Sequence, residues 1–351
     1  MPVSSPTPAG SRERLVRHRA ARLEDWIHDI RERWARRRGH LPTVVPYTGY
    51  GSTEWVRVFC RVLLTRPLPA DASKRRRRRR EQGIRGWRSF TSVPVGDVPV
   101  IIEIGDERIE VLADRGGVVD TKIPVALEPG WHQVSLRTEG SETVEAPVWI
   151  VGPDVRFGLI SDVDDTVMVT ALPRPFVAFW NTFVLDEHAR IPTPGMAVLY
   201  ERLVRTHPGA PVIYLSTGAW NVAPTLTRFL SRNLYPAGPL LLTDWGPTHD
   251  RWFRSGREHK EENLRRIAGE FPDIRWLLVG DDGQHDEELY ARFAAEHPER
   301  VAAVAIRRLS TGEAVLAGGR TKGEQHGANV PWVSASDGSN LADQLADVGV
   351  L

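Results

Sequence analysis

The chain has 351 residues, which is long enough for two domains that each bury a core of their own. With 41% hydrophobic and 26% charged residues, the composition excludes a largely disordered or fibrous protein. The formal net charge of +1 excludes a globally basic protein, although arginines gather toward the N-terminus. A single cysteine, Cys60, excludes a disulfide framework and a cysteine-rich metal site, and it fits a reducing compartment.

Residues 1–43 are expected to hold a disordered start and a basic amphipathic helix. Apolar residues recur every three or four positions between Ser11 and Arg38, which predicts one apolar helical face. That face comprises Val16, Ala20, Leu23, Ile27, Ile30 and Trp34. The helix either packs on the next domain or lies on an anionic membrane. Acids interspersed among the outer arginines favour packing.

Residues 44–152 predict an accessory domain of β-strands. Short alternating runs such as WVRVFCRVLL and GWHQVSLRT, separated by Gly, Pro and Asp, are typical of an antiparallel β-sandwich or barrel. Inside this region lies a polybasic loop, residues 74–80, made of one lysine and consecutive arginines. Adjacent like charges cannot pack, so the loop is either simply solvated or a patch for phosphate groups of lipid or nucleic acid.

Two observations bear on location. No apolar stretch reaches the roughly 18 to 20 residues needed to cross a bilayer, and MPVSSPTPAG lacks the apolar segment of a signal peptide. We therefore expect a cytoplasmic protein whose membrane contact, if any, is peripheral.

Residues 153–351 predict an α/β domain. The apolar runs RFGLIS, PVIYLS, PLLLT, RWLLVG and VAAVAIR alternate with helical patterns such as HKEENLRRIAGEF. Near-continuous apolar strands alternating with helices indicate a Rossmann-like parallel sheet covered on both faces. A polar stretch from Arg320 and a short C-terminal helix are expected to end the chain.

Sites in such sheets form just beyond the carboxyl ends of the strands. Three aspartates within four positions follow the first apolar run, and such close carboxylates repel unless a cation offsets them. A carboxylate can attack phosphorus, and Mg²⁺ is the natural ion to cancel the repulsion from phosphate. The polar residues at these strand ends are Asp162, Asp164, Asp165, Thr166, Ser216, Thr217, Asp281, Asp282 and Asp286, with Lys260 expected ahead of the helix that feeds the fourth strand.

These motifs, in this order, resemble those of the haloacid dehalogenase superfamily. The resemblance implies that Asp162 is the nucleophile and a metal ligand, and that Asp281 is an acidic metal ligand. Asp164 would give its backbone carbonyl to Mg²⁺ and its side chain as general acid and base, which points to a phosphatase. Asp286 would orient bound water rather than bind the metal directly. The resemblance assigns no role to Asp165, for which stabilising the turn is one option.

The remaining motifs imply contacts to the phosphoryl group. Ser216 should donate a hydrogen bond to it and Lys260 should neutralise its charge in the transition state. Thr166 and Thr217 complete the expected substrate-binding set. Thr166 is also expected to bond locally and hold the loop, and the choice between Ser216 and Thr217 as the main phosphate contact stays open.

From about Val44 to Arg308 the chain further resembles the phosphatidate phosphatases typified by the fungal actin-patch enzyme. The most specific part of this resemblance is the fourth motif, VGDDGQHDEELY. In YLSTGAW the chain has Thr-Gly-Ala-Trp after the serine, where the family usually has Asn-Ser-Pro-Trp. It implies Mg²⁺-dependent conversion of phosphatidate to diacylglycerol and a small cap within residues 167–195. The aromatic side chains of this insert either contact acyl chains or pack on the core. Asp282 replaces the usual Ser and would add negative charge near the metal.

Two other functions compete with this interpretation. One is a phosphatase for a soluble phosphomonoester or a nucleic-acid end, with the polybasic loop as the phosphate contact. Few aromatics interleave with the arginines, so nucleic acid is the less favoured partner. The other is an inactive lipid-binding module, which would have no need of Asp164. An anionic phospholipid is the favoured substrate.

Overall fold

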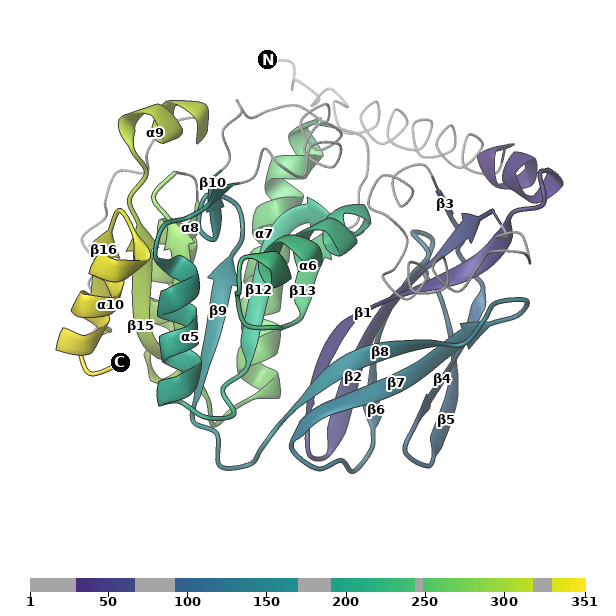
Figure 1. Ribbon diagram of the computed structural model, residues 1–351, viewed down its shortest axis with the longest axis horizontal. Coiled ribbons are helices and arrows are strands. Elements are labelled where there is room, and N and C mark those ends of the chain that lie inside the picture. Colours follow the sequence, from purple (N-terminus) through teal and green to yellow (C-terminus); the bar gives the residue numbers. More distant parts are fainter. Residues whose placement is uncertain (1–29, 67–91, 170–190, 244–248, 284, 318–329) are drawn as a thin grey trace, which may run out of the picture.

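The computed structural model describes residues 30–66, 92–169, 191–243, 249–283, 285–317 and 330–351. Within these ranges the chain forms two sheets side by side, a curled β-sheet from the N-terminal half and a helix-covered parallel sheet from the rest (Figure 1). Several predicted features lie outside the described residues: the disordered start with most of the N-terminal helix, the polybasic loop 74–80, the aromatic insert at 170–190 and most of the polar stretch from Arg320.

The first sheet has eight strands that curl around a core of their own. Their order is β3-β2-β1-β8-β7-β4-β5, and β6 also pairs with β2. Alternating side chains such as Val58, Ile102, Leu136 and Ile150 are fully buried in that core, which is why these β-branched runs form strands. The strands are β1 (Leu41–Ser52), β2 (Trp55–Thr65), β3 (Val93–Pro94), β4 (Pro99–Ile104), β5 (Glu107–Leu112), β6 (Val118–Pro124), β7 (Gly130–Thr138) and β8 (Val144–Val151).

One pairing in this sheet differs from the expectation. β1 and β8 run parallel, whereas every other described pair in the sheet is antiparallel. The expectation of a purely antiparallel domain is therefore wrong at this pair. A parallel pair needs a long connection, and the six strands between β1 and β8 provide it.

The described part of the N-terminal helix, residues 30–37, contacts the first sheet through a different face from the one predicted. Ala35 is buried in the core of that sheet, whereas Ile30 and Trp34 are 41% and 53% exposed. The guanidinium of Arg38 lies 3.3 Å from the centroid of the Trp34 ring. The prediction that the helix packs on the next domain through Ile30 and Trp34 was therefore wrong.

The second sheet has six strands, all parallel, in the order β13-β12-β9-β14-β15-β16. Its inner strands are buried along almost their whole length, because helices cover both faces. The strands are β9 (Phe157–Asp162), β12 (Val212–Ala219), β13 (Leu240–Thr243), β14 (Arg275–Asp281), β15 (Val301–Arg307) and β16 (Trp332–Ala335). A small ribbon pairs β10 (Met168–Val169) with β11 (Ile191–Pro192).

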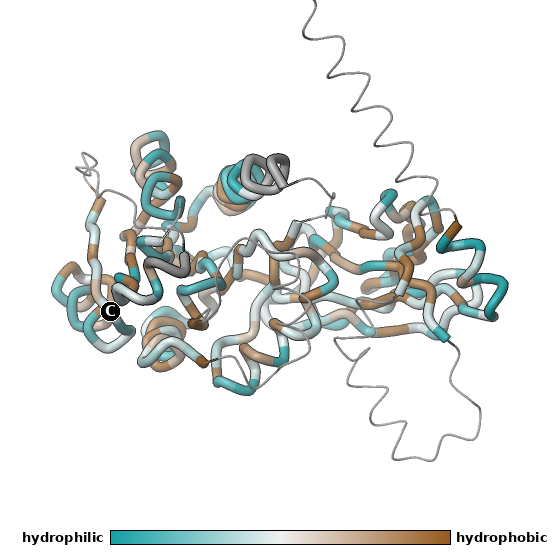
Figure 2. The backbone as a smooth tube through the Cα atoms, turned by 90° about the horizontal axis from the view of Figure 1, so that it is seen from above, coloured by the Kyte–Doolittle hydropathy of each residue, from teal (hydrophilic) through white to brown (hydrophobic). Residues whose placement is uncertain are grey.

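Helices lie on both sides of this sheet, as the view from above makes clear (Figure 2). Helices α5 and α10 pack together beside β15 and β16, while α7 and α8 pack on β12, β13, β14 and β15 from the opposite face (Figure 1). No helix within the described ranges combines the length and apolar character needed to cross a membrane. The helices are α5 (Met196–Thr206), α6 (Ala223–Arg232), α7 (His249–Glu270), α8 (Asp286–Glu296), α9 (Thr311–Ala317) and α10 (Gly338–Asp347), with short 3₁₀ turns η2 (Trp220–Val222) and η3 (Pro298–Arg300).

The strand order places a switch point beside β9. From β9 the chain moves to β12 and β13 on one side, then returns to β14 on the other side and continues outward to β15 and β16. The carboxyl ends of β9 and β14 are therefore where connections leave in opposite directions. In open parallel sheets this is the place where ligands bind.

Candidate active site

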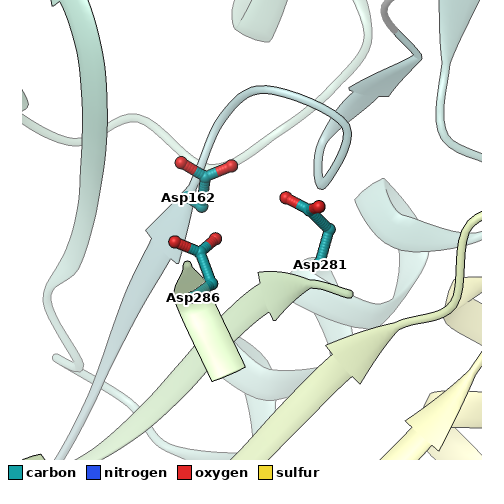
Figure 3. A group of neighbouring side chains, drawn as sticks. All are labelled: Asp162, Asp281 and Asp286. Carbon is teal, nitrogen blue, oxygen red and sulfur yellow. The ribbon is translucent and has the colours of Figure 1, made fainter. Parts of the chain in front are cut away.

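Two aspartates end the neighbouring strands at the switch point. Ser161 of β9 pairs in register with Val279 of β14, so Asp162 and Asp281 emerge together just beyond that pair. Asp286, the first residue of α8, adds a third carboxylate. One ligand oxygen from each of the three residues lies within 4.8 Å of the others, all three are buried, and their carboxylates converge (Figure 3).

Lys260 supplies the positive charge that faces these acids. Its Nζ donates to Oδ1 of Asp162 at 2.7 Å and to Oδ1 of Asp286 at 2.6 Å. Burial acts to lower the pKa of Lys260, but the two carboxylates outweigh it and hold this pKa above its usual value. Lys260 lies in the middle of α7, so the expectation that it precedes the helix was wrong.

The environment of Asp162 disfavours its charged form. Burial is the main cause that raises its pKa well above the usual range, and the charges of Asp286, Asp164 and Asp281 act in the same direction. Lys260 opposes them, but one cation does not balance a group of three acids. A further cation at this place would favour the ionised carboxylate.

The loop after β9 is held by a buried arginine. Asp165 has a left-handed backbone conformation, with φ of 59°, which few residues other than Gly, Asn and Asp adopt. Nη1 of Arg307, at the end of β15, donates to the carbonyl of Asp165 at 2.7 Å, and Nη2 donates to Oε1 of Glu313 at 2.6 Å. Arg307 thus joins the turn after Asp162 to the end of another strand.

Thr166 differs from the expectation. Its side chain is fully buried, and its hydroxyl has no hydrogen-bond partner among the described residues. The predicted local bond that would hold the loop is therefore wrong. The loop is closed instead by a backbone bond from the amide of Val167 to the carbonyl of Val163 at 3.1 Å.

The second half of β12 brings Ser216 to Asp164. Oγ of Ser216 donates to Oδ2 of Asp164 at 3.1 Å and accepts from the amide of Gly218 at 3.0 Å. The carbonyl of Thr217 accepts from the Thr243 hydroxyl at 2.9 Å, which ties this segment to β13. Of the two predicted hydroxyl residues, Ser216 is therefore the one hydrogen-bonded to Asp164.

Glycine at position 280 allows Asp286 to approach. A Cβ on Gly280 would lie 2.8 Å from Oδ2 of Asp286 and 2.8 Å from the ring of Tyr290. Real Cβ contacts are essentially never that short, so α8 can pack on β14 only because no side chain stands there. The neighbouring Asp282 is outside the three-acid group, and its Oδ1 accepts from the amide of Leu309 at 2.8 Å.

The structure thus brings together most of the predicted site and adds Arg307 to it. Asp162, Asp281 and Lys260 lie in one cluster, with Asp164 and Ser216 beside it. Asp286, expected to orient bound water rather than bind the metal directly, lies in the same group of converging carboxylates. Arg307 was not predicted, because one arginine at the end of an apolar run carries no signal of burial.

A known family model matches the part of the chain that holds this cluster. Residues 157–308 match the family model of the catalytic domain of the phosphatidate phosphatase APP1. The match contains the whole cluster and confirms the resemblance to phosphatidate phosphatases for this region, although it begins at 157 rather than near Val44.

Two fungal proteins are each similar to part of the chain. Phosphatidate phosphatase APP1 of Saccharomyces cerevisiae is 31% identical over 157 residues, which cover 44% of this chain and 26% of the yeast protein. An uncharacterized protein of Schizosaccharomyces pombe is 27% identical over 150 residues, 42% of this chain and 24% of its own length. The chain therefore spans about a quarter of the length of these relatives.

Among solved structures, a carbohydrate acetylesterase from Xanthomonas citri aligns with 79% of this chain and 73% of its own at 9% identity. Its TM-score of 0.29 is too low to support an argument about fold or function.

Proposed function

We propose that this chain is a Mg²⁺-dependent phosphatase that removes the phosphate of phosphatidate through an aspartyl-phosphate, leaving diacylglycerol. The observation that carries the proposal is the convergence of Asp162, Asp281, Asp286 and Lys260 inside the region that matches a phosphatidate phosphatase catalytic domain. We also assign the domain to the haloacid dehalogenase superfamily, on its motif order and the parallel sheet that carries the motifs.

Asp162 is the nucleophile in this proposal. Its carboxylate oxygen attacks phosphorus, the bond from phosphorus to the glycerol oxygen breaks, and the phosphoryl group is left on Asp162. Lys260, 2.7 Å away, holds positive charge where negative charge gathers on the transferring group. Ser216 and Thr217 are the proposed hydroxyl donors to its oxygens, and buried Thr166 completes the expected substrate-binding set.

The acid group fits a hard divalent cation. The donor set consists of carboxylate oxygens, which Mg²⁺ prefers, and Oδ2 of Asp286 is buried with no hydrogen-bond partner among the described residues. Asp162, Asp281 and Asp286 would hold the ion, with the backbone carbonyl of Asp164 as the fourth expected ligand. Bound Mg²⁺ would supply positive charge that offsets the phosphate and keeps Asp162 ionised.

Asp164 is the proposed general acid and base. Protonated, it gives its proton to the departing glycerol oxygen; as a carboxylate, it then takes a proton from the water that attacks the aspartyl-phosphate. The hydrogen bond from Ser216 to Oδ2 of Asp164, at 3.1 Å, supports a fixed orientation for this side chain. Attack by water releases inorganic phosphate and restores Asp162.

Phosphate release tests the proposal. We expect release from phosphatidate in mixed micelles with Mg²⁺, none with EDTA, and none from Asp162→Asn. Asp164→Asn should lose most of the rate. Activity on soluble phosphomonoesters and none on phosphatidate would favour the competing hypothesis of a soluble substrate. No Mg²⁺-dependent release from any substrate would support the inactive module. Cytoplasmic location and peripheral contact with an acidic membrane stay predictions.

A further inference from the structure

Besides its own core, the first sheet contributes side chains to the apolar core of the α/β part. Tyr47, Tyr50 and Phe59 of the first sheet belong to the same buried cluster as Trp220 and Phe271 of the α/β part. The aromatic rings meet across the boundary: Tyr50 and Phe271 have centroids 5.9 Å apart, and Phe59 and Trp220 have centroids 5.8 Å apart. The first sheet therefore packs directly on the α/β part.

One contact reaches the strand end that carries Ser216. The ring of Tyr47 stacks on Trp220 with centroids 4.8 Å apart and planes 23° apart, and its hydroxyl donates to the carbonyl of Trp220 at 3.1 Å. Trp220 follows the last residue of β12 directly and is buried. Tyr47 thus holds the backbone four residues beyond Ser216, from outside the α/β part.

A second set of contacts reaches the helix that carries Lys260. Glu270, the last residue of α7, accepts from the hydroxyl of Tyr50 at 2.7 Å and from Nη2 and Nε of Arg57 at 2.8 and 3.1 Å. Asp120 of β6 accepts from Nη1 of Arg266 at 2.9 Å and also pairs with Arg57. Two acids and two arginines thus join α7 to the first sheet.

This network continues along α7 toward Lys260. Nη2 of Arg266 donates to Oδ1 of Asn263 at 2.5 Å, and the side-chain amide of Asn263 donates to the carbonyl of His259 at 2.8 Å. His259 is the residue before Lys260. Partly buried ion pairs of this kind add little net stability because desolvation offsets their attraction, but their geometry fixes position.

We infer that the N-terminal β-sheet is a working part of the candidate site, and that Tyr47, Arg57 and Glu270 are positioning residues for Ser216 and Lys260. The inference rests on the proposed function for its activity readout. The sheet holds the two elements that must place a hydroxyl and an ammonium group around the nucleophile. A misplacement on the order of 1 Å can cost about a hundredfold in rate, so loosening either element should reduce turnover.

The test uses three interface variants: Arg57→Gln, Glu270→Gln and the double variant that carries both changes. Arg265→Gln is the control. Arg265 lies on the same helix, but its ion pairs are with Glu261 and Glu296, away from the first sheet. Each single interface variant should lower kcat on the order of tenfold with little change in KM, because Lys260 acts on the transition state. The double variant should be no slower than either single one, and Arg265→Gln should match the wild type.

Hydrogen–deuterium exchange across residues 257–266 gives a readout independent of activity. Exchange there should rise in the interface variants and not in Arg265→Gln. A matching pair probes the other contact: Tyr47→Phe keeps the stack on Trp220 and should retain more activity than Tyr47→Ala.

Folded interface variants with wild-type kcat and unchanged exchange would overturn the inference while leaving the phosphatase proposal intact. If the wild type releases no phosphate, the proposed function fails, and exchange alone decides whether the sheet holds α7.

Discussion

The ammonium group of Lys260 lies between two carboxylates, 2.7 Å from Oδ1 of Asp162 and 2.6 Å from Oδ1 of Asp286. Asp281 completes the group of three buried acids, and Lys260 bonds to the other two. The group therefore carries more negative than positive charge when all its members are ionised.

Replacing Lys260 by methionine should slow turnover. Lys260→Met keeps the length of the side chain but removes the charge beside Asp162, so kcat should fall by about 10²–10³-fold. Steady-state hydrolysis of p-nitrophenyl phosphate with saturating Mg²⁺ measures this. Lys122→Met is a matched control, because Lys122 lies over the Trp55 ring of the first sheet. A Lys260→Met variant within a few-fold of the wild type would exclude the assigned role.

Mg²⁺ should stabilise the folded protein through the acid group. An ion present at a hundred times its Kd adds about 2.7 kcal/mol to the free energy of unfolding. Asp286→Asn should lose much of this stabilisation, and without the ion it should be at least as stable as the wild type, because one repelling carboxylate is gone. Thermal unfolding with Mg²⁺ and with EDTA measures both effects. Equal stabilisation of both proteins by Mg²⁺ would remove Asp286 from the ligand set.

A methyl group at position 280 should damage the site. In Gly280→Ala the new Cβ would meet Asp286 and Tyr290 at 2.8 Å, so α8 must shift and activity should fall at least tenfold. Gly269→Ala on α7 is the control, since a Cβ there has nothing within 4 Å and should raise stability by about 0.5–1 kcal/mol. Thermal unfolding and phosphate release compare the two variants. Wild-type activity in Gly280→Ala would show that α8 need not pack so closely.

Arg307→Met should loosen the turn after the nucleophile. It removes the donor to the carbonyl of Asp165 and leaves Glu313 without its buried partner, which should cost about 1–3 kcal/mol of stability. The kcat of the variant should also fall when it is assayed well below its melting temperature, where loss of folded protein cannot explain the decrease. Arg308→Met, at the exposed next position, is the control. If both variants have equal kcat, the loop does not depend on Arg307.

Acid should destabilise the fold through His259. Burial is the main cause that lowers the pKa of this imidazole from 6.5 to about 4, so the folded state favours the neutral ring. The contribution of His259 to the free energy of unfolding is complete above about pH 6.5 and is lost as the pH falls toward 4. Over this range the unfolded chain binds the proton before the folded protein does. The loss of stability amounts to roughly 3 kcal/mol. Urea unfolding at several pH values should give a shallower acid decline for His259→Gln. An identical decline would assign the effect to other groups.

The acidic residues of the candidate site could be predicted from the sequence more reliably than the helices and strands around them. Asp162 and Asp281 each follow a long apolar run, and such runs are buried strands whose ends could be located. Strand β16 was missed because its four residues, WVSA, follow a polar stretch and give no period to detect.

Other misses concern residues whose role depends on tertiary contacts. Asp286 can reach the other acids because Gly280 has no Cβ in its way. The spacing of residues along the sequence does not reveal this close approach. Arg307 is buried by partners 142 and 6 residues away in the chain. The side chains of Tyr47 and Glu270 form hydrogen bonds with residues that are far from them in the sequence. The contact between the two sheets could therefore not be predicted.

Trapping the phosphorylated enzyme tests the central claim most directly. Asp164→Asn should be slow to hydrolyse the aspartyl-phosphate, so it should accumulate label when mixed with phosphatidate labelled in its phosphate and then quenched in acid. The account predicts hydroxylamine-sensitive label on the peptide that contains Asp162, and none when Asp162 is also replaced by Asn. Turnover of phosphatidate with no label on Asp162, or label on another residue, would contradict it.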